Sequence, residues 1–232
     1  MTTLLMALVG WFAGWLLNRL SDYLPRFSVT EKPKPVAVRS NWPAVLELIS
    51  GKAPLKRSWL LLDAGIEVLS ALFFAIMWSQ LGASLAFLFA ICGYTFFLLI
   101  AIIDFKYRLV LNVLTYPAIV ILLILNLVTL PQQTTNILLG GAMAFGIFFL
   151  TAWLRPGELG GGDVKLATLI GVAFGFPQML IALLVGAGIG GIVVVFLLVS
   201  RKAGWKSQIA YAPFLCLGAM FLLLSHSMLI LS

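Results

Sequence analysis

The chain has 232 residues, of which 62% are hydrophobic and only 10% are charged. This composition excludes an ordinary water-soluble domain and indicates an integral membrane protein, because apolar stretches of membrane-spanning length dominate the chain. Its 15 Lys and Arg residues against 8 Asp and Glu give a net charge of +7. Basic loops on the cytoplasmic side of a membrane account for that charge, so no nucleic-acid partner is needed to explain it.

Eight apolar stretches are predicted to span the membrane, since a spanning helix needs about 20 residues. In chain order they cover residues 4–20, 59–79, 82–103, 109–130, 135–154, 164–178, 180–200 and 209–230. The first lacks the basic start and the small-residue cleavage site of a signal peptide, and we interpret it as a helix. The sixth is the weakest, being short and containing Gly171, Gly175 and Pro177. The predicted fold class is all-α: a polytopic membrane protein with about eight transmembrane helices.

The chain is predicted to have three parts: a first transmembrane helix (1–20), a cytoplasmic loop (21–57) and a seven-helix membrane domain (58–232). The loop contains five prolines among scattered charges, and it is too short to bury a core of its own. Its apolar part, residues 42–49, is predicted to form a short helix on the membrane surface.

The distribution of basic residues predicts the orientation of the spans. If residues 1–3 lie outside the cell, all 15 Lys and Arg residues fall on one side of the membrane. The loops on the other side, around residues 80, 131–136 and 175–178, carry no charge. Because cytoplasmic loops are rich in Lys and Arg, both termini are predicted to lie outside the cytoplasm. The basic face is expected to meet anionic lipid headgroups.

Two acidic residues lie at predicted cytoplasmic ends of spans, where ionisable groups call for a functional explanation. Asp104 ends the third span, and Asp163 opens the sixth directly after three glycines, Gly160, Gly161 and Gly162. The topology brings both carboxyl groups to one membrane depth. Two carboxyl groups close together share one proton, so one can deprotonate a water while the other polarises a carbonyl. We therefore predict aspartyl protease chemistry, with Asp104 and Asp163 as its catalytic residues.

Structural interpretations of the same residues remain open at this point. Asp163 has the position of a helix N-cap, and Asp104 has Lys106 and Arg108 nearby as ion-pair partners. The glycines also suggest a phosphate-binding loop, but the Walker spacing and a preceding strand are missing.

The two aspartate motifs resemble those of bacterial type IV prepilin peptidases, the GxGD group of intramembrane aspartyl proteases. Residues 158–166 are similar to the second aspartate motif of that family, and residues 102–104, followed by Arg108, Asn112, Thr115 and Pro117, resemble the first. Residues 14–25, 67–74 and 212–219 resemble further segments of the family. The resemblance implies that Asp104 and Asp163 remove the leader of type IV prepilins or type II secretion pseudopilins at the cytoplasmic face of the bacterial inner membrane.

One departure from the family concerns metal binding. Many members carry two CxxC pairs in the first cytoplasmic loop, whereas residues 21–57 contain no cysteine here. Cys92 and Cys216 fall inside predicted spans without CxxC spacing, so neither a metal site nor a disulfide is predicted. Cleavage is expected to need no cofactor. The resemblance also implies N-methylation of the new amino terminus from S-adenosylmethionine, although no glycine-rich nucleotide motif is visible.

Several polar residues and glycines near the motifs are candidate substrate contacts: Gly160, Gly161, Gly162, Glu158, Lys165, Asp63 and Glu67. An unwound substrate exposes backbone N–H and C=O groups that need hydrogen-bond partners at membrane depth. Glycines, which lack a Cβ, allow such an extended backbone to approach closely. The acidic residues are expected to attract the basic leader of the family's substrates. The alternative is that Asp63 and Glu67 form ion pairs with Arg57 or Lys165, and that Lys165 stabilises a charged aspartate or anchors its helix at the interface.

Two other classes of function are weighed against the peptidase. A small proton- or cation-coupled transporter would hold charges near the bilayer midplane and show repeated halves, neither of which the sequence has. A non-catalytic membrane scaffold would tolerate replacement of an aspartate. The glycine pairs Gly10 and Gly14, Gly171 and Gly175, and Gly186 and Gly190 are spaced for close helix packing.

Overall fold

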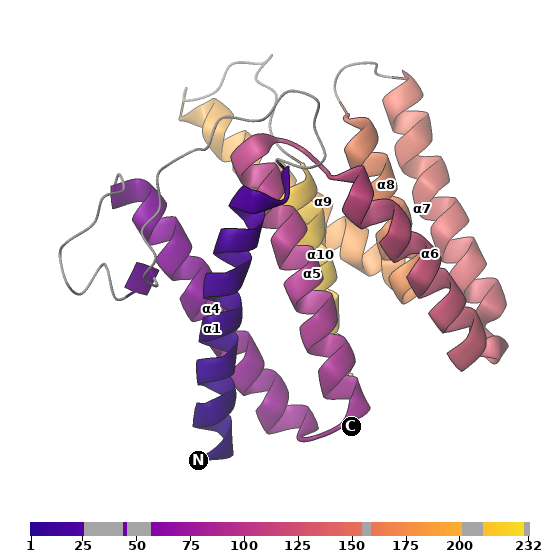
Figure 1. Ribbon diagram of the computed structural model, residues 1–232. Helices are drawn as coiled ribbons and strands as arrows, with labels where there is room; N and C mark the ends of the chain where they lie inside the picture. Colours follow the sequence, from indigo (N-terminus) through magenta and orange to yellow (C-terminus); the bar gives the residue numbers. More distant parts are fainter. Residues whose placement is uncertain (26–43, 46–56, 155–158, 201–210, 230–232) are drawn as a thin grey trace. The chain divides into compact units, whose positions relative to one another are not determined.

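The computed structural model of this protein describes residues 1–25, 44–45, 57–154, 159–200 and 211–229. All regular elements in this part of the chain are helical (Figure 1), which confirms the predicted all-α class. The predicted surface helix at 42–49 falls outside the described residues, apart from Ala44 and Val45.

Eight long helices in the described ranges correspond to the eight predicted spans. They are α1 (Thr2–Tyr23), α4 (Arg57–Leu81), α5 (Leu85–Tyr107), α6 (Asn112–Thr129), α7 (Thr134–Leu154), α8 (Gly161–Phe174), α9 (Gln178–Val199) and α10 (Ala212–Leu229), with a one-turn 3-10 helix, η1 (Pro131–Gln133), before α7. Six of them, α1, α4, α5, α6, α7 and α9, are long and apolar enough to cross a membrane. The protein is thus a polytopic helical membrane protein.

The sixth predicted span differs from the helix observed there. It was placed at 164–178, whereas α8 runs from Gly161 to Phe174 and has 14 residues. The helix stops at Gly175, whose φ of 68° and ψ of 177° lie in a non-helical region that is open essentially only to glycine. The earlier start places Asp163 inside the first turn of α8.

The chain divides into two compact units, one made of Met1–Ile102 with Leu223–Ser232 and the other of Ile103–Leu222. Helix α5 contributes to both units, and its last turn belongs to the second. The predicted division at residues 20 and 57 rests on membrane topology, which this partition does not test, and it stays a prediction.

In the first unit, α1 and α4 lie side by side (Figure 1) because two glycines let their backbones approach closely. A Cβ added at Gly14 would stand 2.8 Å from the Cα of Glu67, and one at Gly10 would meet Ser70 and Phe74. The close packing predicted for this glycine pair is therefore confirmed.

In the second unit, α8 packs against α6 and α7. Half of α8 is buried: Val164, Leu166, Ala167, Leu169, Ile170, Gly171 and Val172. A Cβ at Gly171 would collide with the backbone of Gly140 on α7, and Asn126 Nδ2 of α6 donates a hydrogen bond of 2.8 Å to the Val172 carbonyl. Helix α8 is thus held on one side by close backbone contact and on another by a polar bond.

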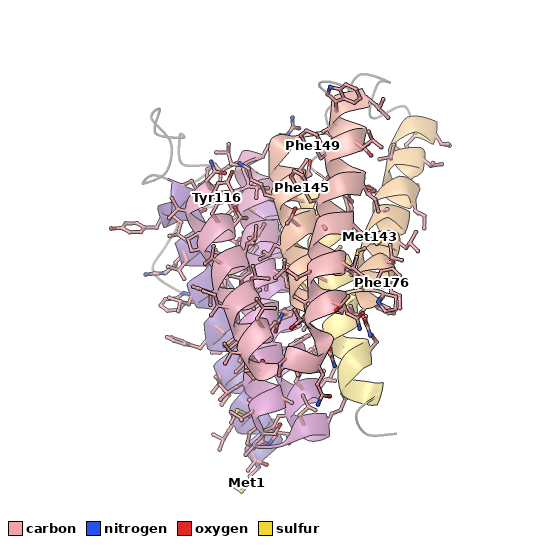
Figure 2. The ribbon with its side chains drawn as sticks, turned by 90° about the vertical axis from the view of Figure 1, so that its right-hand side faces the viewer. Met1, Tyr116, Met143, Phe145, Phe149 and Phe176 are labelled. Atoms are coloured by element: carbon pink, nitrogen blue, oxygen red, sulfur yellow. The ribbon has the colours of Figure 1, made fainter. Side chains whose placement is uncertain are left out.

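The outer helices of this unit carry apolar side chains outward. Phe145 and Phe149 stack on α7 with ring centroids 5.3 Å apart, as the labelled side chains in Figure 2 illustrate. Both rings are exposed in the isolated chain, as expected for a surface that meets lipid. Gly186 and Gly190 of α9 face Phe214 of α10, which confirms the packing predicted for that pair.

Candidate active site

Asp104 lies in the last turn of α5 and is almost completely buried, with 5% of its surface exposed. Its carboxyl group accepts a hydrogen bond from the backbone N–H of Ala212, at the start of α10, and lies within the electrostatic influence of Arg108. Among the described residues, none forms a hydrogen bond with its Oδ2 atom, which is itself buried. One carboxyl oxygen of Asp104 is therefore fixed by backbone and the other remains available.

Arg108 ends α5 in an unusual backbone conformation. Its N–H donates to the Asp104 carbonyl over 2.7 Å, and its φ is 54°. A residue with a Cβ adopts this left-handed conformation at a cost on the order of 1 kcal/mol. The turn reverses the chain directly after Asp104, so that Val110 and Asn112 can reach α8.

Asp163 is the third residue of α8 and takes part in the cap of that helix. The N–H of Gly160, the N-cap residue, donates to Asp163 Oδ2 over 3.3 Å, and the N–H of Asp163 donates to the Gly160 carbonyl over 3.0 Å. Asp163 is thus not the N-cap itself, which was the structural alternative. A carboxylate in the first turn is stabilised by the positive end of the helix dipole.

Asp104 and Asp163 both belong to the second compact unit. The charge of Asp163 acts on the carboxyl group of Asp104. Tyr211, directly before α10, also lies beside Asp163: burial raises the pKa of its hydroxyl, and the charge of Asp163 raises it further. The end of α5 and the starts of α8 and α10 therefore converge around two carboxyl groups.

The three glycines before Asp163 have different surroundings. A Cβ at Gly162 would stand 2.8 Å from the Cβ of Val110, so this glycine allows α8 to lie against the segment that follows Asp104. Around Gly161 a Cβ would meet no described atom within 4 Å, and at Gly160 it would stand 3.4 Å from Asp163 Oδ2. Among the described residues, the Cβ side of Gly161 is therefore open, whereas that of Gly162 is filled by packing against Val110.

Lys165 points to α6. Its Nζ donates a hydrogen bond of 2.7 Å to Asn112 Oδ1 and stands 4.8 Å from the centroid of the Tyr116 ring. Figure 2 labels Tyr116 on α6. The ammonium group of Lys165 thus joins the helix of Asp163 to the segment that follows Asp104.

The candidate residues on α4 belong to the first unit and are buried. Glu67 is 1% exposed and accepts hydrogen bonds from the N–H groups of Ala44 (2.8 Å) and Val45 (3.1 Å) and from Trp11 Nε1 (3.0 Å). Asp63 is 3% exposed, and its backbone carbonyl accepts a bond of 3.1 Å from Asn18 Nδ2. These partners of Glu67 are neutral N–H donors, whereas the alternative interpretation of the sequence paired it with Arg57 or Lys165.

Some residues of the site were missed by sequence reasoning, and one predicted residue falls outside the description. Glu158 lies outside the described residues. Ala212 opens the segment 212–219, whose similarity was noted, but Tyr211, one residue before it, was not singled out. Val110 gave no signal, because it lies at the apolar start of the fourth predicted span, 109–130.

The fold and site define a polytopic helical membrane protein with two carboxyl groups paired at helix ends. Residues 91–195 match the model of the type IV leader peptidase family. This stretch includes both aspartates, the three glycines and Lys165. The predicted resemblance to type IV prepilin peptidases is therefore confirmed.

The chain is also similar to a prepilin leader peptidase/N-methyltransferase of Bacillus subtilis (strain 168). The two sequences are 23% identical over 154 residues, which is 66% of this chain and 62% of the relative. The match thus covers somewhat less than two thirds of the relative's length. No solved structure gives a significant match.

Proposed function

We propose that this protein is an intramembrane aspartyl endopeptidase that removes the basic leader peptide of type IV prepilins or type II secretion pseudopilins. The observation that carries the proposal is the meeting of Asp104 and Asp163, from the ends of two different helices, inside the stretch that matches the leader peptidase family. Two carboxyl groups close together in a poorly solvated site cannot both be ionised, so the pair holds one shared proton.

Because the pair holds one proton, one carboxyl group acts as a base and the other as an acid in peptide hydrolysis. The charged carboxylate removes a proton from a water molecule, whose oxygen attacks the scissile carbonyl carbon. The protonated carboxyl group donates its proton to the carbonyl oxygen, which gives a tetrahedral intermediate with two hydroxyl groups. The first carboxyl group then passes the proton taken from water to the leaving nitrogen, a hydroxyl proton returns to the second carboxylate, and the C–N bond breaks to release the amine. The buried Oδ2 of Asp104, which has no hydrogen-bond partner among the described residues, is available for the shared proton or for the substrate carbonyl.

The substrate peptide must be extended at the site, because a helix keeps its peptide bonds out of reach. Unwinding frees N–H and C=O groups that need partners at membrane depth. The backbone around Gly161, where a side chain would meet no described atom within 4 Å, offers the least obstructed approach to Asp163.

The surroundings of the reaction follow from the same proposal. The enzyme is a multi-pass protein of the bacterial inner membrane, with its site at the cytoplasmic face, both termini outside the cytoplasm, and prepilins and membrane lipids as its partners. Cleavage needs no cofactor. N-methylation of the new amino terminus from S-adenosylmethionine is a second proposed activity, supported by the name of the Bacillus relative, which includes an N-methyltransferase.

The test is a reaction with purified components. The protein is incubated in detergent with a candidate prepilin, with and without S-adenosylmethionine, and the new amino terminus and its methylation are mapped by mass spectrometry. We expect a single cut between leader and apolar helix, absent with Asp104→Asn or Asp163→Asn protein. A product of the same size from both variants would assign the cleavage to a contaminating protease and overturn the proposal.

A further inference from the structure

The side chain of Lys165 links the two segments that carry the aspartates. It lies two residues after Asp163 on α8. Its ammonium group is held by Asn112 Oδ1 at 2.7 Å and by the face of the Tyr116 ring at 4.8 Å. Asn112 and Tyr116 are four residues apart on α6 and therefore share one helix face. The ammonium group of Lys165 thus contacts two side chains, Asn112 and Tyr116, that lie one helical turn apart.

Both contacts have a defined geometry. An ammonium donor makes a stronger, more directional hydrogen bond than a neutral donor, and a cation over the face of an aromatic ring adds a further attraction. The packing of Gly162 against Val110 joins the same two segments nearby. An apolar contact and a polar contact therefore act together to fix the start of α8 relative to the segment after Asp104.

We propose that Lys165, Asn112 and Tyr116 form a positioning clamp that holds Asp163 in register with Asp104. The inference rests on the proposed peptidase function and deepens it, because it assigns Lys165 to the geometry of the aspartate pair and not to substrate contact. A displacement of about 1 Å in a catalytic group lowers a rate about 100-fold. The start of α8 needs this fixation because Gly160, Gly161 and Gly162 leave its entry conformationally free.

The clamp is tested with two single variants and their combination: Lys165→Met, Asn112→Leu, and Lys165→Met with Asn112→Leu. Each single variant breaks the contact between α8 and α6, and we expect kcat to fall about 10- to 100-fold with KM changed less than about twofold. The double variant removes the same contact. Its kcat should therefore be no lower than that of either single variant, because residues that act as one unit are not additive.

A matched control exists on the same pair of helices. Asn126 also bonds from α6 to α8, through the Val172 carbonyl at 2.8 Å, but at the other end of α8. Asn126→Leu should lower the unfolding temperature in detergent and leave the kcat of the folded enzyme unchanged. A raised KM with intact kcat in Lys165→Met would instead identify a substrate contact. Losses that multiply in the double variant would show that Lys165 and Asn112 act independently, and either result would overturn the clamp.

A second measurement keeps the clamp separate from the peptidase proposal. Amide hydrogen exchange in the first turn of α8, at Gly162, Asp163 and Val164, is measured without substrate. We expect faster exchange in Lys165→Met, and a similar rate in the double variant, because both lack the same contact. Unchanged exchange in the single variant would refute the clamp, even if the enzyme cleaved no prepilin at all. If the wild-type protein cleaves no prepilin but the exchange rates follow the expected pattern, the peptidase proposal is refuted and the clamp is not.

Discussion

Two carboxyl groups in this protein are buried to a similar extent but differ in their hydrogen bonds. Glu67 is 1% exposed and Asp104 is 5% exposed. Three N–H donors, from Trp11, Ala44 and Val45, bond to the two oxygens of Glu67. Asp104 accepts one backbone N–H, from Ala212, and its Oδ2 has no hydrogen-bond partner among the described residues.

Under the proposed function, this difference separates a structural carboxyl group, Glu67, from a reactive one, Asp104. Leaving a buried polar atom without a partner costs about 1–3 kcal/mol, more for a charged group, and folded proteins seldom retain such an atom without a reason. Both oxygens of Glu67 accept hydrogen bonds, and these bonds connect α4 to α1 and to residues 44–45. Asp104 keeps one oxygen without a hydrogen-bond partner among the described residues and lies within the electrostatic influence of Asp163, which suits the shared proton and the substrate carbonyl of the proposed mechanism.

The strongest test of the comparison is removal of the reactive carboxyl groups. We expect Asp104→Asn and Asp163→Asn each to lower cleavage by about 10⁴-fold, and the double variant to be no worse, because residues that act as one unit are not additive. Asn retains the shape but cannot carry the shared proton. Leader removal is measured on purified protein whose folded amount is verified in the membrane. Near-normal processing by either single variant would rule out the pair.

The glycine contact between the two aspartate segments is expected to have the next largest effect. Gly162→Ala places a Cβ 2.8 Å from the Cβ of Val110 and should reduce kcat about 10- to 100-fold by displacing Asp163. Val110→Gly in the same protein removes the clash and should restore much of the loss. Gly171→Val, which disturbs the contact with Gly140, should reduce abundance more than specific activity. Equal specific activities of Gly162→Ala and wild type would refute the packing role.

Replacing the structural carboxylate should affect stability and not chemistry. In Glu67→Gln an amide NH₂ faces N–H donors, so at least one buried hydrogen bond is lost, and we expect a destabilisation of about 1–3 kcal/mol. Thermal unfolding in detergent measures this change, and specific activity is measured on the folded fraction. A loss of kcat at normal stability would assign Glu67 to the reaction or to attraction of the leader, as the sequence alone had suggested.

Metal removal is expected to have no effect on stability or cleavage. Residues 21–57 contain no cysteine, so the tetrahedral thiolate sites that zinc prefers cannot form there. Strong chelators are expected to leave both the unfolding temperature and the rate of cleavage unchanged, since structural zinc is coupled to folding where it occurs. Stoichiometric zinc in purified protein, detected by elemental analysis, would contradict this expectation.

The sequence predicted the features that depend on local pattern. The length of the apolar stretches located eight helices. The basic loops and the two aspartate motifs predicted that Asp104 and Asp163 lie at one membrane depth. The partners of these residues depend on pairing between distant segments, as in the contacts of Gly162 with Val110 and of Lys165 with Asn112. The sequence offered Glu67 as a residue that attracts the basic leader or forms an ion pair. Its own helix gives no sign that the N–H groups of Ala44 and Val45 donate to it.

The shortness of α8 has a consequence for the lipids around the protein. Its 14 residues make a rod of about 21 Å, whereas the hydrocarbon layer is about 30 Å thick. A lipid-facing helix of that length would strain the bilayer through hydrophobic mismatch. Because α8 packs against α6 and α7 and half of it is buried, the longer outer helices meet the acyl chains instead. Cleavage in vesicles should therefore vary little as the acyl chains are lengthened by a few carbons, and a steep dependence would show that α8 itself meets the lipid.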